Sequence, residues 1–478
     1  MSAFPSATPP PSWHGGACGA GRPGASWSTR PRTRRTGGAW CSSTAWPATF
    51  SSTTSSRTPR TGPNSTRSER AKAIEPMVTV KLETDEIQRA VDDAAAAGGG
   101  VVRIGPGTHE CGTIHLRSRV TIDLAPGATL MATADDAAFD SFEDLPYTPF
   151  ADQETSDFRY ALLAGEDLED VAIVGQGCLD DARHRRIGPK PIALKRCRRV
   201  TVSGITIQHA PNYAVSLLGC DHVVVHGVTI LDGYADGIDP DCCRFVRISD
   251  CHVDCWDDAI CLKASLSLGE RRPTEHVTVT NCTLRSCCNH LKLGTESSGD
   301  FRHIAFTNCT MLARPDDAPV PSVENAGLAI ESVDGARIVG LVASNLAMDE
   351  VRTPIFVRLG NRGRGMDTPV PGAIEDVVIS NVVAHGACET SSITGLAERA
   401  VAGVTLRDVR VRSAGGQRVP GPAAVPEVEG EYPAATMFGP LPAHGLYVRH
   451  VRRLSLHDVE LTTDETDARP GLAAEDVT

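Results

Sequence analysis

An apolar segment with one internal bend recurs along residues 171–461 of this 478-residue chain. Each copy has alternating apolar residues, then Gly, Asn or Asp, then alternation again, as in VTVSGITI from Val200 and VTVTNCTL from Val277. Alternation predicts short strands, and a bend residue that tolerates left-handed backbone angles predicts a turn between them. Most copies lie about 23 to 37 residues apart, as expected of solenoid coils. The other copies begin at Val171, Val223, Val246, Ile304, Leu341, Val377, Val404 and Leu454.

Like residues recur at the bend of successive copies, which favours coils stacked directly on one another. Stacking places each side chain on its equivalent about 4.8 Å away. Helical repeats are excluded because the apolar residues alternate, and a β-sandwich explains the recurrence less well. We therefore predict an all-β fold, a single-stranded right-handed parallel β-helix. The recurring pairs are Asp250-Cys251, Asn281-Cys282 and Asn308-Cys309.

The start of the chain predicts an extension and then a cap. Residues 1–76 are rich in Ser, Thr, Pro, Gly and Arg, and we expect a disordered or misannotated extension there. Residues 77–478 are expected to form one β-helix domain. TDEIQRAVDDAAAA, residues 84–97, predicts an amphipathic helix that covers the first coil, with Ile87 and Val91 on its apolar face.

Three insertions interrupt the repeat, at residues 140–158, 311–325 and 413–447. Insertions in a solenoid tend to gather on one face. We therefore expect these segments to wall a groove, which is where loops carry binding and catalytic residues.

Composition excludes several classes of protein. The net charge is −12 although residues 1–76 carry ten Lys and Arg against two Glu, so the rest of the chain is strongly acidic. Such a body disfavours nucleic-acid binding. No run approaches the ~18 apolar residues of a membrane span, and no hydrophobic secretory segment is found near the start. We expect a cytoplasmic rather than a secreted protein, with no membrane partner and an unknown oligomeric state.

Twelve of the 16 cysteines lie between Cys178 and Cys309, many at one position of the repeat. That position predicts small apolar core residues. The spacing lacks the paired CxxC pattern of a structural zinc site, so we predict no metal and no cofactor.

One segment, YADGIDPDCCRFVRISDCHVDCWDDAICLK from Tyr234 to Lys263, brings three carboxylates within about one repeat of each other. These are Asp236, Asp257 and Asp258, and one turn of a coil would place the first beside the other two. Two carboxyl groups that face each other across a cleft are the minimum for cleaving a glycosidic bond. The alternatives are a turn aspartate before a glycine and a solvated acidic corner.

These residues resemble the polygalacturonase family, glycoside hydrolase family 28, over about residues 78–461. The resemblance rests on AAAAGGGVVRIGPGTH near the start, on ADGID from Ala235 and on DDAICLK from Asp257. It implies a right-handed β-helix that hydrolyses galacturonan and related pectic chains with inversion. It also implies that Asp257 protonates the leaving oxygen, while Asp236 and Asp258 activate water.

The chain departs from the family pattern at several positions. Tyr234-Ala235 stands where the family has Asn-Thr, and Trp256 where it has Gly. The Gly-His-Gly motif is reduced to Asn289-His290-Leu291, and the Arg-Ile-Lys motif to Arg358-Leu359-Gly360. These departures leave open whether plain polygalacturonate is the substrate.

Further residues are candidates for the site. His290 is a candidate catalytic residue, with a structural role as the alternative. Trp256 and Tyr234 either stack on a sugar ring or fill the wall of the groove. The candidates for binding an acidic sugar are Lys263, Lys292, Arg358 and Arg362.

We predict an inverting glycoside hydrolase that acts without cofactor on pectin-type, galacturonan or rhamnogalacturonan-like oligosaccharides. A polysaccharide lyase, a non-catalytic carbohydrate-binding β-helix, and an epimerase or other sugar-modifying β-helix enzyme remain alternatives. A lyase would release an unsaturated product and often needs Ca²⁺.

Overall fold

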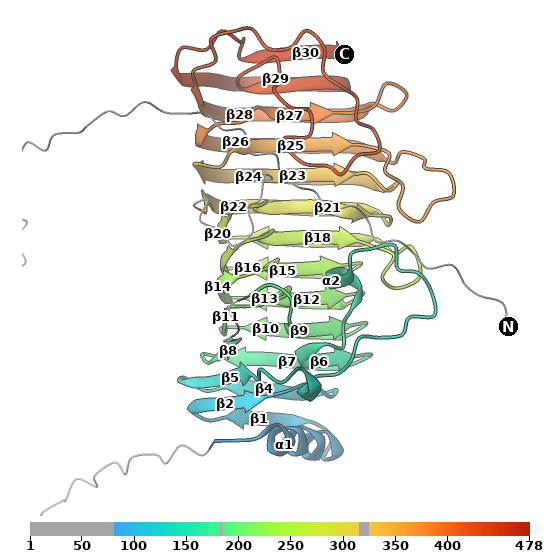
Figure 1. Ribbon diagram of the computed structural model, residues 1–478, viewed down its shortest axis with the longest axis vertical. Helices are drawn as coiled ribbons and strands as arrows, with labels where there is room; N and C mark the ends of the chain where they lie inside the picture. The colour runs from blue at the N-terminus through green and yellow to red at the C-terminus, as the bar shows by residue number, and fades with distance from the viewer. Residues whose placement is uncertain (1–80, 182, 184, 315–324) are drawn as a thin grey trace, which may run out of the picture. The chain divides into compact units, whose positions relative to one another are not determined.

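The structure is a computed structural model that describes residues 81–181, 183, 185–314 and 325–478. These residues form a right-handed parallel β-helix, as predicted, in which each coil pairs with the next (Figure 1). The predicted extension, residues 1–76, lies outside the described residues. Within the described ranges no helix has the length and apolar character needed to cross a membrane.

The strands form three stacks, which we call faces 1, 2 and 3, and the pairings along each face are parallel. Face 1 contains β3 (Ile114–His115), β6 (Ala161–Glu166), β9 (Lys190–Lys195), β12 (Val215–Leu218), β15 (Ile238–Asp241), β18 (Ile260–Ala264), β21 (Leu291–Ser297), β23 (Ala326–Ser332), β25 (Thr353–Leu359), β27 (Ser391–Thr394), the start of β29 (Leu446–Glu465) and β30 (Leu472–Val477).

Face 2 contains β1 (Gly100–Ile104), β4 (Val120–Leu124), β7 (Glu169–Gly175), β10 (Arg198–Ser203), β13 (Asp221–His226), β16 (Arg244–Ser249) and β19 (Thr274–Thr280). Face 3 contains β2 (Gly107–Cys111), β5 (Ala128–Ala132), β8 (Cys178–Asp180), β11 (Thr206–Gln208), β14 (Thr229–Gly233), β17 (His252–Cys255) and β20 (Thr283–Ser286). From β22 (Phe301–Ala313) onward a single long strand in each coil runs through faces 2 and 3. The later strands of this kind are β24 (Arg337–Asp349), β26 (Ala373–Ala387) and β28 (Val401–Gly415).

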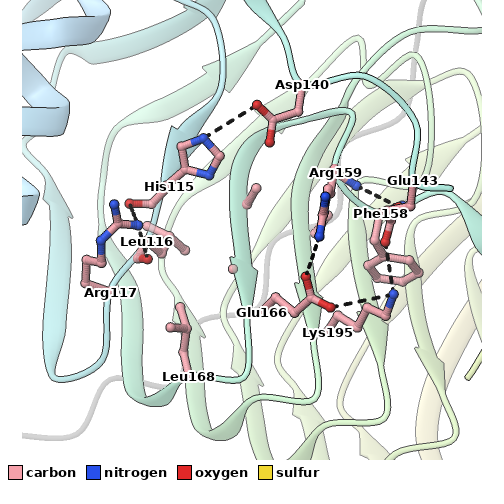
Figure 2. Close-up of a pocket in the computed structure, with 13 residues that line it drawn as sticks. His115, Leu116, Arg117, Asp140, Glu143, Phe158, Arg159, Glu166, Leu168 and Lys195 are labelled. Atoms are coloured by element: carbon pink, nitrogen blue, oxygen red, sulfur yellow. Dashed lines mark hydrogen bonds and ion pairs between the residues drawn. The ribbon is translucent and has the colours of Figure 1, made fainter. Parts of the chain in front are cut away.

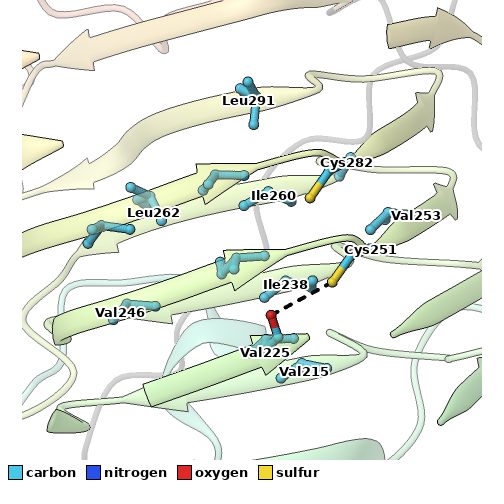
Figure 3. Packing of buried hydrophobic residues seen from close by; sticks show 14 of the residues in the cluster. Val215, Val225, Ile238, Val246, Cys251, Val253, Ile260, Leu262, Cys282 and Leu291 are labelled. Atoms are coloured by element: carbon cyan, nitrogen blue, oxygen red, sulfur yellow. Dashed lines mark hydrogen bonds between the residues drawn. The ribbon is translucent and has the colours of Figure 1, made fainter. Parts of the chain in front are cut away.

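The interior of the coil is filled by the alternating apolar residues that defined the repeat. Val225, Val246 and Cys251 are buried side by side with their equivalents in the next coil (Figure 3). The predicted cap is α1 (Thr84–Ala96), whose Ile87 and Val91 are buried against the first coils. A solenoid needs this cover because its first coil has no neighbour on one side.

Each predicted bend residue adopts the left-handed conformation. Seven of these residues are Asn or Asp, which tolerate positive φ through local hydrogen bonding, and three are Gly. The repeat therefore predicts the position of every one of these turns correctly. The residues are Gly175, Gly204, Gly227, Asp250, Asn281, Asn308, Asn345, Asn381, Asp408 and Asp458, with φ between 51° and 124°.

Like residues stack at the bends, as the repeat predicted. Asn381 donates to Asn345 at 2.9 Å, and Asn345 donates to Asn308 at 2.9 Å, so the side-chain amides form a ladder. Of the fourteen cysteines that the structure describes, twelve are buried. Their position in the core confirms that they act as small apolar residues.

Two insertions lie against face 1. Residues 133–160 contain a short 3-10 helix, η1 (Asp136–Ala138), and one helical turn, α2 (Gln153–Ser156). Residues 416–445 cover the face from β23 to β29, where Phe438 and Leu441 pack on Phe356. The C-terminal insertion therefore covers its part of the sheet and does not merely flank it. The predicted insertion at 311–325 is described only in part, because residues 315–324 lie outside the described ranges.

Candidate active site

The register of the coils gathers the predicted carboxylates in one column. Ile238 of β15 pairs with Ile260 of β18, and Asp236 and Asp258 each stand two residues earlier. The next strand of face 1 continues this column with Asn289. One coil therefore places Asp236 beside Asp258, as the spacing of the motifs predicted.

Lys263 joins two of the acids from the outward side of β18. Its Nζ lies 2.6 Å from Asp236 Oδ2 and 2.8 Å from Asp239 Oδ2. The same ammonium lies 4.2 Å from the ring centroid of Tyr213, a cation–π contact. These residues are buried, and Asp236 also accepts the backbone N–H of Asp258 at 3.3 Å.

Asp258 is held by its own set of donors. Lys292 Nζ lies 2.9 Å from Oδ2. Asn289 donates to Oδ1 twice, from its backbone N–H at 3.1 Å and its side-chain amide at 2.8 Å. A carboxylate with an ammonium partner and several N–H donors is stabilised in its ionised form.

Asp257 is the carboxylate that reaches solvent. Its side chain is 23% exposed, compared with 5% for Asp236 and 6% for Asp258. Arg186 Nη1 contacts Asp257 Oδ2 at 2.6 Å, while Nε and Nη2 of the same arginine grip Glu154 at 3.0 and 2.7 Å. Arg186 comes from the turn before β9 and Glu154 from α2, so two distant segments meet at this acid.

Electrostatics separate the acids into two states. Burial, and then the charge of Asp239, raises the pKa of Asp236 well above its usual range. Burial also raises the pKa of Asp239 to about 6, against the effect of Lys263. Burial acts on Asp258 in the same direction, but the ammonium groups of Lys292 and Lys263 outweigh it and lower its pKa to about 2. The cluster therefore keeps Asp258 ionised and favours a proton on Asp236.

Asp257 and Asp258 approach more closely than expected for an acid and a base. Their nearest oxygens lie within 4.8 Å, whereas the carboxyl groups of inverting glycosidases stand ~6.5–9.5 Å apart. The reason is local, because Asp257 Oδ1 turns back to accept the backbone N–H of Asp258 at 3.0 Å. An outward rotation of the Asp257 side chain would widen this gap.

Trp256 and Tyr234 are half-buried beside the acids. The guanidinium carbon of Arg314 lies 3.5 Å from the ring centroid of Trp256, so an arginine already covers one face of the indole. This contact favours a role in the wall of the groove for Trp256.

The structure does not bring His290 to the carboxylates. Its Nε2 lies 2.8 Å from the carbonyl oxygen of Leu312, and its Nδ1 lies 3.2 Å from that of Ala326. Asn289 and His290 both lie in the turn before β21, and Asn289 occupies the position, two residues before Leu291, that matches Asp258 in the coil before. The expected histidine contact with the acids is therefore made by the asparagine one residue earlier.

Arg358 and Arg362 are held by partners other than the acids of the site. Arg358 is fully buried on β25, where it donates to the carbonyl oxygens of Glu427 and Val428 at 2.8 and 3.1 Å. Arg362 pairs with Asp334 through two nitrogens, at 3.0 and 2.6 Å. The sequence placed both arginines in an accessible Gly-rich loop. The C-terminal insertion instead occupies the guanidinium group of Arg358, and Asp334, from the turn after β23, occupies that of Arg362.

Among the described residues, two groups of side chains have the spacing of metal ligands: Asp236, Asp258 and Cys261, and Asp257, Asp258 and Cys288. Asp258, which both groups contain, already contacts the ammonium group of Lys292, and Asp236 contacts that of Lys263. A divalent cation would lie next to these buried positive charges, so the donor set does not fit a metal.

Sequence reasoning missed Arg186, Glu154, Tyr213 and Asn289. Tyr213 and Asn289 could have been found, because both stand two residues before a face 1 strand, at the position of Asp236. Arg186 gave no comparable signal, since it contacts an acid 71 residues later from an irregular turn.

A cavity of about 350 Å³ opens on the same face nearer to α1 (Figure 2). Lys195 on β9 lies in its wall, 2.9 Å from Glu143 and 3.8 Å from Glu166. A second cavity of about 510 Å³ is lined by Glu154 and by Arg186, the arginine that contacts Asp257. Face 1 therefore offers concave surface on the α1 side of the acids.

The comparisons with known proteins agree with this architecture. The model of glycosyl hydrolases family 28 matches residues 174–425. A probable polygalacturonase of Vitis vinifera is 25% identical over 246 residues, which are 47% of this chain and 50% of that relative. One of Arabidopsis thaliana is 24% identical over 178 residues, which are 30% of this chain and 39% of that relative. The chain thus spans half or less of the length of these curated relatives.

Two solved structures are similar over most of the chain. The hyperthermoactive exopolygalacturonase of Thermotoga maritima has a TM-score of 0.62 at 18% identity, covering 80% of this chain and 88% of that one. The family 28 exopolygalacturonase of Yersinia enterocolitica has a TM-score of 0.56 at 16% identity, covering 83% and 75%. At such identity the likeness shows the fold.

Fold and site together define a right-handed parallel β-helix with an acidic cluster on face 1. The family model matches more than half of the chain, so this protein belongs to glycosyl hydrolases family 28.

Proposed function

We propose that the chain is an inverting glycoside hydrolase that acts on pectin-type oligosaccharides, of the galacturonan or rhamnogalacturonan-like kind. The observation that carries the proposal is the pair of neighbouring acids on face 1, of which Asp258 is ionised and Asp257 reaches solvent. Family membership and relatives named as polygalacturonases support the substrate class.

In the proposed reaction a water molecule attacks the anomeric carbon while the bond to the leaving oxygen breaks. Asp257 gives its proton to that oxygen, and the neighbouring carboxylate Asp258 takes a proton from the water. Asp236 supports the base, held in place by Lys263. The attack comes from the side opposite the leaving group, so the product is inverted.

The many cysteines packed as small apolar residues in the core support a cytoplasmic site of action. Thiol-reducing systems in the cytosol would keep adjacent cysteines such as Cys242-Cys243 reduced. Short imported oligosaccharides would then be the natural substrates.

A reducing-end assay on a panel of pectic oligosaccharides tests the activity. We expect Asp257→Asn and Asp258→Asn to lower kcat by about 10²–10⁴-fold, the usual worth of general acid–base catalysis. Asp464→Asn, which changes an exposed acid paired with Arg412, should keep full activity. The anomer first formed, followed by proton NMR, reports inversion. Full activity of the Asp257 variant, or an unsaturated product, would contradict the proposal.

A further inference from the structure

The three cations that contact the acids differ in exposure. The side chains of Lys263 and Lys292 are 4% and 3% exposed, while that of Arg186 is 29% exposed. Among the described residues paired with Asp236, Asp257 or Asp258, Arg186 is therefore the cation that an arriving anion can reach.

An anionic sugar needs such a cation at this site. Asp236 and Asp239 already share the ammonium group of Lys263, and Asp258 holds that of Lys292, so neither buried lysine is available to a further carboxylate. The arginines that the sequence offered for this role, Arg358 and Arg362, are occupied by other partners.

Arg186 is already aligned to receive a carboxylate. Glu154 grips one edge of the planar guanidinium with two parallel hydrogen bonds, which fixes the orientation of the fork. Nη1 projects from the other side to Asp257 Oδ2 at 2.6 Å. The next residue, Ile187, is 75% exposed and has a φ of 74°, a strained angle for a β-branched side chain.

The contact between Arg186 and Asp257 also obstructs the chemistry. Asp257 must direct a protonated oxygen at the leaving group, but Nη1 of Arg186 occupies that carboxyl edge. The contact must therefore break before the acid can act, and a competing carboxylate would break it without leaving the arginine unpaired.

Resting on the function proposed above, we propose that Arg186 is the specificity-determining residue for a uronate sugar. The substrate carboxylate takes Nη1 from Asp257, Glu154 keeps the guanidinium in place, and Asp257 is freed to face the leaving oxygen. Binding of the uronate sugar therefore releases Asp257 from Arg186 in the same step.

Steady-state kinetics on a galacturonate trisaccharide and its uncharged methyl ester test this proposal. Arg186→Gln should raise KM for the galacturonate trisaccharide about 10–100-fold, because one charge-assisted hydrogen bond is lost. The same substitution should change KM for the methyl ester less than about twofold. Glu154→Gln should give a smaller rise in the same direction. Arg337→Gln, which removes an exposed ion pair on β24, is the matched control.

Binding to the Asp258→Asn protein, with and without Arg186→Gln, separates this proposal from the hydrolase proposal. Calorimetric titration should show that the acid binds more tightly than the ester and that Arg186→Gln removes the difference. That result supports the role of Arg186 even where the wild-type chain cleaves neither sugar, because absence of cleavage refutes only the proposed hydrolase activity. An equal loss of affinity for the trisaccharide and its ester, or no loss of affinity, overturns the role of Arg186. Circular dichroism confirms that each variant is folded.

Discussion

Single residues at the site differ by the direction in which they point. Asn289 and His290 are neighbours, yet Asn289 donates to Asp258 and His290 contacts backbone carbonyls in the interior. The sequence favoured the histidine because of its residue type. Position in the coil decides the matter, because Asn289 stands two residues before Leu291 as Asp258 stands two before Ile260, and this match is seen only when the coils are aligned on their apolar residues.

Substitutions at these two positions should therefore have different effects. We expect Asn289→Ala to lower kcat about 10-fold or more, because Asp258 loses its side-chain amide donor, with little change in KM. Conservative replacement of the buried imidazole, His290→Gln, should instead lower the unfolding free energy by about 1–3 kcal/mol and leave the kcat of the folded fraction unchanged. Urea unfolding and kinetics on the same samples check both. A larger kcat loss for the His290 variant would reverse the assignment.

Asp239 should make stability depend on pH. Its pKa is raised to about 6 from 3.8, so the folded state holds the proton more tightly than the unfolded chain. This contribution is complete below about pH 4 and is lost as the pH rises to about 6, by up to roughly 3 kcal/mol. Asp239→Asn cannot titrate, so its urea-unfolding free energy should fall less between these pH values. Parallel curves for the two proteins would show that Asp239 does not cause the loss.

Among the elements, the bends were the most predictable part of the fold. Each was identified from one Gly, Asn or Asp between alternating residues, since few residue types tolerate left-handed angles. The same local rule could not find the contact of Arg186 with Asp257, because that contact joins irregular segments that only the folded coil brings together.

Gly227 tests this account of the bends. It has a φ of 61°, and a Cβ added there would meet no atom within 4 Å. Gly227→Asn should raise the unfolding free energy by about 0.4–1 kcal/mol, because Asn restricts the unfolded chain and tolerates the angle. Gly227→Val should lower it by about 1–2 kcal/mol, because a β-branched residue opposes the left-handed turn. The urea midpoint of each variant measures its stability. Equal changes for Gly227→Asn and Gly227→Val would show that the left-handed backbone angle does not determine the effect.

At the scale of the whole β-helix, the C-terminal insertion limits how far a substrate can extend along face 1. Residues 416–445 donate no catalytic group, but their carbonyl oxygens cap two buried arginines of the sheet, Arg358 and Arg449. The two preceding coils make the corresponding turn in three residues, between Asp349 and Thr353 and between Ala387 and Ser391. The insertion is thus an addition to a coil that can close without it.

Replacing residues 416–445 by the three-residue turn Glu350-Val351-Arg352 should therefore lengthen the open groove. The change would uncover the guanidinium groups of Arg358 and Arg449, which would then face solvent on the same sheet as the acids and attract an anionic chain. We expect the ratio of kcat/KM on polymeric galacturonan to that on a trisaccharide to rise about 10-fold, and added salt to reduce the gain. The loop-replacement variant that also carries both Arg358→Gln and Arg449→Gln should lose most of this gain. An unchanged ratio in a folded variant would mean that the groove already ends before β23, set by the loops around Arg186 and Arg362.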